Sequence, residues 1–279
     1  TIKYLEIELS SDSAFSDWLK GEKIHFTSEI LNEQITENAL STGNIFTEKK
    51  LEDFILLLES EYSQAGYFNS KIIQNIEIDT QNRAGIVLIV SQGNRATIDS
   101  FVISGSDKIS EKELLKLFKI GEPDMALINY FTNKDDFSDS KLRNGIEMMT
   151  QTYFDTGYLD FKVLEVKSNL NENKEKLSIN IEVSEGIQYK LGDVSFEGEL
   201  GNISESELNN TVSMSKGDVF NRNLIITDIQ SLTDLYADQG YAFVDVNPIT
   251  SDFLDSVDIN FDISLNKKTY LNRITITGN

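Results

Sequence analysis

The stretch "YFDTGY" at residues 153–158 has two close copies in the chain, "YSQAGY" at 62–67 and "YADQGY" at 236–241. Before each copy, apolar residues recur at intervals of four, three and four, which is the spacing of one face of an α-helix. Glycine adopts positive φ at little cost, so the Gly of each copy is expected to end that helix. We assign structural roles to the six tyrosines and three glycines: Tyr62, Gly66, Tyr67, Tyr153, Gly157, Tyr158, Tyr236, Gly240 and Tyr241.

Two strands are expected after each copy of the hexapeptide. In the segment 177–183, "LSINIEV", apolar and polar residues alternate, and the segment 257–263, "VDINFDI", does the same. This alternation is typical of a strand with one buried face and one face in water. Polar segments such as "NLNENKEK" read as the turns of hairpins.

A second marker supports the repeat. Gly93 and Gly186 each lie 12 residues before another Gly, at 105 and 198, and Asn266 takes the same place before Gly278. We expect all three turn residues to have positive φ, because Asn tolerates this conformation best after Gly. "ISEKELL" at 109–115 and "ISESELN" at 203–209 place Ser three residues before Glu, a pattern that caps helix starts.

The repeating unit is therefore strand, helix, helix, strand, strand, and it occurs three times in 279 residues. The predicted fold class is α+β. The final segment "YLNRITITGN" reads as the first strand of a fourth unit, so we interpret the chain as part of a longer protein.

This order, together with the "Y-x3-GY" helix stop and the "EG" turn, resembles the POTRA domain. The resemblance implies a three-stranded mixed sheet covered by two helices on one face. The long segment 121–142 between the helices of the middle unit resembles the third of five POTRA domains in the factors that assemble Gram-negative outer-membrane barrels. In that register, residues 1–95, 96–187 and 188–266 resemble the second, third and fourth domains, and 267–279 opens the fifth.

The resemblance also implies a function. Such arrays form the periplasmic portion of an outer-membrane protein whose full-length chain ends in a β-barrel. Their partners are accessory lipoproteins and unfolded outer-membrane proteins. The array is a scaffold that binds these partners and supports the folding of barrels and their insertion into the outer membrane. The lipoprotein is expected at the helix end and loop of the middle unit, at Phe118, Ile120 and Met125.

Unfolded clients are expected to pair with unpaired strand edges. The resemblance places the second strand of each unit at an edge, in the segments 70–79, 161–169 and 243–251. We favour the middle edge, which has neither Pro nor Gly, whereas Pro248 removes a donor from the third. The candidate binding residues there are Phe161, Lys162, Val163, Leu164, Glu165, Val166 and Lys167.

Composition excludes several other classes. The formal net charge of −21 makes nucleic acid a poor partner. There is no Cys, the single His is His25, and no loop has the ligand pattern of a calcium-binding EF-hand. No catalytic set, cofactor site, metal site or small-molecule substrate is expected, and the chain is not predicted to be an enzyme. Two alternatives remain open: the POTRA array of a related transporter, TamA or a two-partner secretion pore, and a repeated adhesion module.

Overall fold

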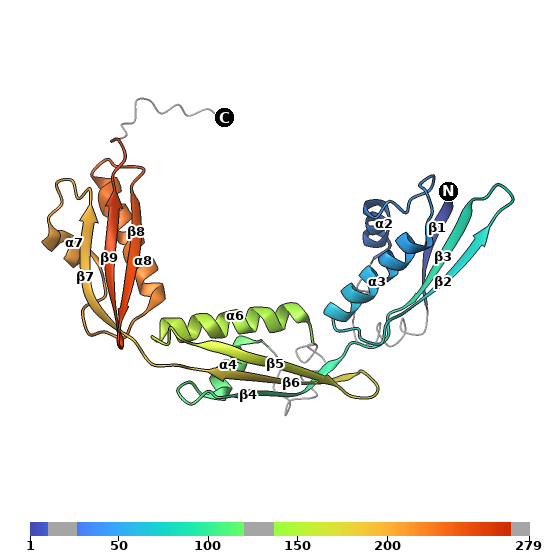
Figure 1. Ribbon diagram of the computed structural model, residues 1–279, viewed down its shortest axis with the longest axis horizontal. Helices are drawn as coiled ribbons and strands as arrows, with labels where there is room; N and C mark the ends of the chain where they lie inside the picture. The colour runs from blue at the N-terminus through green and yellow to red at the C-terminus, as the bar shows by residue number, and fades with distance from the viewer. Residues whose placement is uncertain (11–26, 120–136, 269–279) are drawn as a thin grey trace, which may run out of the picture. The chain divides into compact units, whose positions relative to one another are not determined.

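The computed structural model describes residues 1–10, 27–119 and 137–268, and it contains three repeats of the same element order (Figure 1). The first repeat comprises β1 (Ile2–Leu9), α2 (Ser28–Glu37), α3 (Glu48–Gln64), β2 (Lys71–Ile78) and β3 (Ala84–Ser91). The middle repeat comprises β4 (Thr97–Ser104), α4 (Glu111–Leu117), α6 (Asp139–Asp155), β5 (Lys162–Leu170) and β6 (Lys176–Ser184). The third comprises β7 (Lys190–Gly198), α7 (Glu205–Thr211), α8 (Arg222–Asp238), β8 (Asp245–Phe253) and β9 (Ser256–Ser264).

Each repeat folds around its own three-stranded sheet, with strand orders β1-β3-β2, β4-β6-β5 and β7-β9-β8. The first strand pairs parallel to the central strand in every sheet. In the first and third repeats the second strand pairs antiparallel to it. The predicted α+β class and the β-α-α-β-β order with mixed sheets are therefore confirmed.

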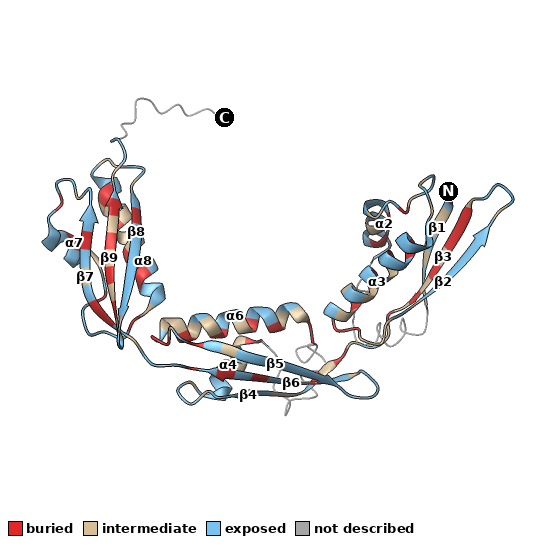
Figure 2. Cartoon of the chain, in the orientation of Figure 1, coloured by how far each residue is buried: buried red, intermediate tan, exposed pale blue. Residues whose placement is uncertain are grey.

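Buried residues alternate with less buried ones along the central strands, as their sequence pattern predicts, and recur on the long helices (Figure 2). Since successive side chains of a strand point to opposite faces, each core lies on one face of its sheet. In β9, Val257, Ile259, Phe261 and Ile263 are all at most 1% exposed. The long helices α3, α6 and α8 supply the opposite side of the core. Two residues before its last residue, each of these helices has a Tyr that is 0% exposed: Tyr62, Tyr153 and Tyr236.

The three long helices stop where the hexapeptide predicts. Gly66, Gly157 and Gly240 have φ of +94°, +86° and +92°, the left-handed region that favours Gly. Ser110 caps α4 with a full capping box to Glu113, and Ser204 caps α7 through the backbone N–H of Glu207.

One turn residue differs from expectation. Gly93 and Gly186 both have φ of +73°, but Asn266 is not among the described residues with positive φ. Its side-chain amide donates to the carbonyl of Phe243 instead. The prediction of positive φ at Asn266 was wrong because a side-chain hydrogen bond takes over the role of the turn.

The chain divides into two compact units, and the division falls inside the middle repeat. One unit contains 1–104, 109–148 and 165–182, and the other contains 105–108, 149–164 and 183–279. The domain boundaries at 95, 187 and 266 stay predictions. Of residues 267–279, predicted to open a fourth unit, only 267 and 268 belong to the described part.

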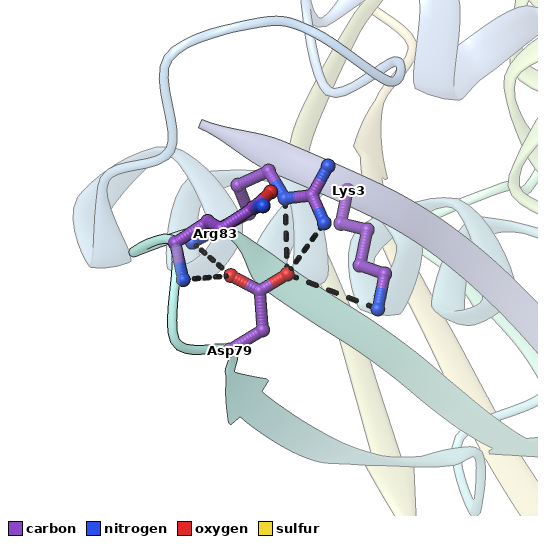
Figure 3. Close-up of polar contacts among 4 residues, drawn as sticks. Lys3, Asp79 and Arg83 are labelled. Atoms are coloured by element: carbon purple, nitrogen blue, oxygen red, sulfur yellow. Dashed lines mark hydrogen bonds and ion pairs between the residues drawn. The ribbon is translucent and has the colours of Figure 1, made fainter.

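The hairpin between β2 and β3 is closed by one carboxylate, that of Asp79 (Figure 3). Its Oδ1 accepts from the backbone N–H groups of Gln81 and Arg83 at 3.0 and 2.9 Å. Its Oδ2 accepts from Arg83 Nε at 2.9 Å and lies 3.8 Å from Lys3 Nζ. The hydrogen bonds from Arg83 lower the pKa of Asp79 to about 2.

We expect Asp79 to make the first repeat less stable in acid. Because its folded pKa lies below the unfolded value of about 3.9, its stabilising contribution is present above that value and is lost as pH falls towards 2. Thermal unfolding of the parent and of Asp79→Asn, compared between pH 6 and 2, checks this. The gap in melting temperature should close as pH falls, and a constant gap would contradict the assignment.

Candidate functional site

The second strand of each repeat is an outer strand of its sheet. The first strands, β1, β4 and β7, are also outer strands, but each has a shift in register against its central strand. In contrast, β2 and β8 pair along their length without a shift. Such bulges twist an edge and hinder further pairing. The strand orders confirm that the second strand of each repeat lies at an edge of its sheet, and strand addition there stays a prediction.

The hydrogen bonds of the first sheet show which groups of β2 face the open edge. The N–H of Asp79 donates to Arg83 O at 3.0 Å, so Asp79 and Arg83 form a hydrogen-bonded pair. In an antiparallel ladder such pairs alternate with pairs that make no hydrogen bond to each other, and this sets the pattern along β2 and β3. Val90, opposite Ile72, accepts from Ser10 on the other side of the sheet at 2.8 Å. The N–H and C=O groups of four β2 residues therefore point outward: Ile72, Gln74, Ile76 and Ile78.

In the third repeat the same argument places Pro248 at the edge. Ile263 accepts from Glu199 N at 2.7 Å on the β7 side, so its partner Val246 directs its backbone groups away from β9. Alternation then directs Pro248 outward as well. A proline at this position leaves the β8–β9 ladder intact and removes one edge donor.

Apolar side chains line the open edges. Ile76 and Ile78 pair with the buried residues Ile86 and Ala84, so they project from the helix-covered face. They are nevertheless 37% and 57% exposed, because the helices leave this margin of the sheet uncovered. The edge of β2 thus combines unpaired backbone groups with an apolar flank.

The middle edge, β5, is exposed along almost its whole length. Leu164 and Val166 are 58% and 39% exposed, and Lys162, Glu165 and Lys167 are exposed, whereas Val163 is half-buried. Lys167 Nζ lies 2.7 Å from Glu165 Oε2, and this carboxylate raises the pKa of Lys167. Phe161 precedes the strand and is only 4% exposed, stacked on Tyr153 with 4.1 Å between ring centroids. Its side chain belongs to the core.

The predicted lipoprotein corner is described in part. Phe118 is 1% exposed and packs against Gly145, where a Cβ would collide with its ring. It also meets Phe101 edge-to-face, with 4.7 Å between centroids. The side chain of Phe118 is therefore committed to packing and not available to a partner. Ile120 and Met125 lie outside the described residues.

The described residues offer no other chemistry. In residues 1–10, 27–119 and 137–268, no cluster of three His, Cys, Asp or Glu residues has the arrangement to hold a metal ion. No helix within the same ranges combines the length and apolarity needed to cross a bilayer. A shallow hollow in the third repeat is lined by Asp193, Asp255 and Asp258, but Asp193 is already paired with Lys216 at 2.6 Å.

The family model described as POTRA, surface antigen variable number repeat, matches residues 19–93, 96–186 and 189–265. The chain belongs to the POTRA family. POTRA domains form a non-enzymatic scaffold family, in agreement with the prediction that the chain is not an enzyme.

Known POTRA proteins similar to this chain include two outer membrane protein assembly factors named BamA. The BamA of Neisseria meningitidis is 27% identical over 254 residues, covering 89% of this chain and 32% of the relative. That of Nitratidesulfovibrio vulgaris is 28% identical over 245 residues, covering 85% of this chain and 30% of the relative. The chain therefore spans about a third of the length of these curated relatives. A crystal structure of POTRA domains 3–5 of Haemophilus influenzae BamA covers 94% of this chain, and this chain covers 96% of it, at 17% identity and a TM-score of 0.48.

Proposed function

We propose that this chain is the periplasmic POTRA scaffold of a BamA-type outer-membrane assembly factor. Its three domains take the places of the second, third and fourth POTRA domains. They hold accessory lipoproteins and receive unfolded barrel proteins by strand addition. The homology to BamA supports the assembly role, and the geometry of the edges supports the mode of binding.

The single observation that carries strand addition is the open, regular edge of β2. Four of its residues present unpaired backbone groups, and two exposed isoleucines flank them. Each added main-chain hydrogen bond contributes about 0.5–1.5 kcal/mol net. Ordering an unfolded peptide opposes this gain, so dissociation constants of roughly 10 μM to 1 mM are expected. Weak binding suits a scaffold that must release its client.

The three edges are not equivalent on this account. Gln74 and Pro248 occupy matching positions in their strands. The first residue whose backbone groups point to the open edge is Ile72 in β2 and Val246 in β8, and Gln74 and Pro248 each lie two residues later. The first repeat has a donor there and the third has none. The edges of β2 and β5 therefore receive clients, and β8 binds them more weakly.

Exchanging these two residues tests the proposal. Gln74→Pro should abolish peptide binding at β2 while keeping the β2–β3 ladder, and Pro248→Gln should strengthen binding at β8. The chain has no Cys, so a fluorophore on Thr80→Cys reports on the first edge and one on Asp255→Cys on the third. The probe is a synthetic peptide that alternates apolar and polar residues like a membrane-barrel strand.

Gln74→Ala is the matched control, because it removes the same side chain and keeps the N–H. It should bind like the parent. Equal binding by Gln74→Pro and Gln74→Ala, with circular dichroism showing both folded, would rule out strand addition at β2.

A further inference from the structure

The left-handed turns that stop the long helices make the same hydrogen bonds in two repeats. Gly66 O accepts from the N–H of Ala96 at 2.9 Å, and Gly157 O accepts from the N–H of Tyr189 at 2.8 Å. Ala96 and Tyr189 are the residues that lead into the first strand of the following repeat. The first set of contacts lies within one compact unit and the second within the other.

One more backbone hydrogen bond recurs beside each turn. Ala96 O accepts from Phe137 N, and Tyr189 O accepts from Phe220 N, both at 3.0 Å. Phe137 and Phe220 stand shortly before the long helix of the following repeat.

The residues that precede Ala96 and Tyr189 each add a side-chain hydrogen bond. Arg95 Nε donates to Ala65 O at 2.8 Å, and Gln188 Nε2 donates to Thr156 O at 2.9 Å. Two different kinds of side chain thus donate to equivalent carbonyls, in each case that of the residue before the turn Gly. The same three hydrogen bonds occur at both turns, which indicates that the contact is specific.

The space around the glycines separates these two turns from the third. A Cβ on Gly66 would lie 2.5 Å from Phe137 O, and one on Gly157 would lie 2.9 Å from Tyr189 O and from a methyl group of Val219. On Gly240 the nearest described atom is Lys268 Cδ at 3.8 Å. Gly66 and Gly157 are buried, whereas Gly240 is half-buried although its φ is nearly the same.

We propose that the helix-stop turn is the docking surface by which one repeat holds the next. Its occupant is the linker and the Phe-bearing segment of the following repeat, recognised through main-chain bonds. The choice of Gly at these two positions thus has two causes, the left-handed backbone and the close approach of the occupant. This inference does not depend on strand addition.

The second docking surface has additional contacts that favour a defined orientation. Asp155 Oδ1 accepts from Asn223 N at 3.1 Å in the first turn of α8, and Asp160 accepts from Tyr189 Oη at 2.9 Å. The guanidinium of Arg222 lies 5.9 Å from the ring centroid of Phe154. The end of α6 is therefore tied to the start of α8 as well as to the linker.

The test compares Gly157→Ala with Gly240→Ala. Both place a Cβ in the same backbone conformation, but among the described residues only the Cβ at 157 meets atoms closer than 3 Å. Spin labels on the exposed residues Gln151→Cys, in α6, and Gln230→Cys, in α8, both within one compact unit, report the distance between the two helices by double electron–electron resonance. The parent should give a narrow distance distribution. Gly157→Ala should lose the narrow peak, and Gly240→Ala should retain it.

A second variant covers the case in which Gly157→Ala does not fold. Gln188→Ala keeps the glycine and removes one of the three bonds, and it should broaden the distribution to a smaller extent. A broad distribution in the parent, or a narrow one in both Gly157→Ala and Gln188→Ala, would overturn the proposal.

Discussion

Tyr153→Ala should lower the free energy of unfolding of the middle repeat by about 3–5 kcal/mol, the range for removing a large buried aromatic side chain. Tyr153 is 0% exposed, stacks on Phe161 and meets Tyr158 edge-to-face. Its hydroxyl donates to Glu185 at 2.8 Å, a carboxylate that is only 8% exposed. The substitution therefore leaves a cavity and removes a donor from a buried charge.

Amide hydrogen exchange along β6 measures this effect in the intact chain. A loss of 3–5 kcal/mol corresponds to exchange faster by on the order of 10²–10⁴-fold where exchange follows opening of the whole repeat. Tyr153→Phe is the matched control, since it keeps the ring and removes only the hydroxyl, at about 1 kcal/mol. Similar exchange in the Ala and Phe variants would mean that the ring contributes little to this core.

Asp228→Ala should destabilise the third repeat by about 3 kcal/mol, because it removes a buried charged acceptor of two hydrogen bonds. Asp228 lies in α8 and is 2% exposed. Its Oδ1 accepts from the backbone N–H and the hydroxyl of Ser213, at 2.7 and 2.6 Å. Without it, two donors in the segment between α7 and α8 lose their partner.

Exchange of the β9 amides gives the corresponding measurement. Asp228→Asn keeps an acceptor oxygen in place and should cost about 1 kcal/mol, so the Ala variant should exchange much faster than the Asn variant. Parent-like exchange in Asp228→Ala would show that water satisfies both donors of Ser213 equally well.

The fold was predictable because the signals repeat. A single "GY" is common, but three copies of a helix face, a left-handed Gly and an alternating strand pair agree in order and spacing. The buried tyrosines and the central strand positions followed from these local periodicities. The same local reasoning predicted both capped helix starts, at Ser110 and Ser204.

Other features depend on contacts between distant residues and have no local signal. The family resemblance predicts Phe118 on a binding surface, yet its ring packs against Gly145, which has no side chain, and lies in the core. In the sequence, Asp228 looks like an ordinary exposed polar residue of a helix. In the structure it is buried and accepts hydrogen bonds from the backbone N–H and the hydroxyl of Ser213. Likewise, the outward direction of Gln74 and Pro248 depends on the register of hydrogen bonds, which periodicity alone does not give.

The most direct test of strand addition is a site-resolved NMR titration of the labelled chain with the barrel-strand peptide. The account predicts that backbone amide shifts cluster on β2 and β5, with the largest changes in β2 at Ile72, Gln74, Ile76 and Ile78 and little change in β8. Shifts confined to the surfaces of α3, α6 and α8, with the edge amides unmoved at saturating peptide, would contradict it.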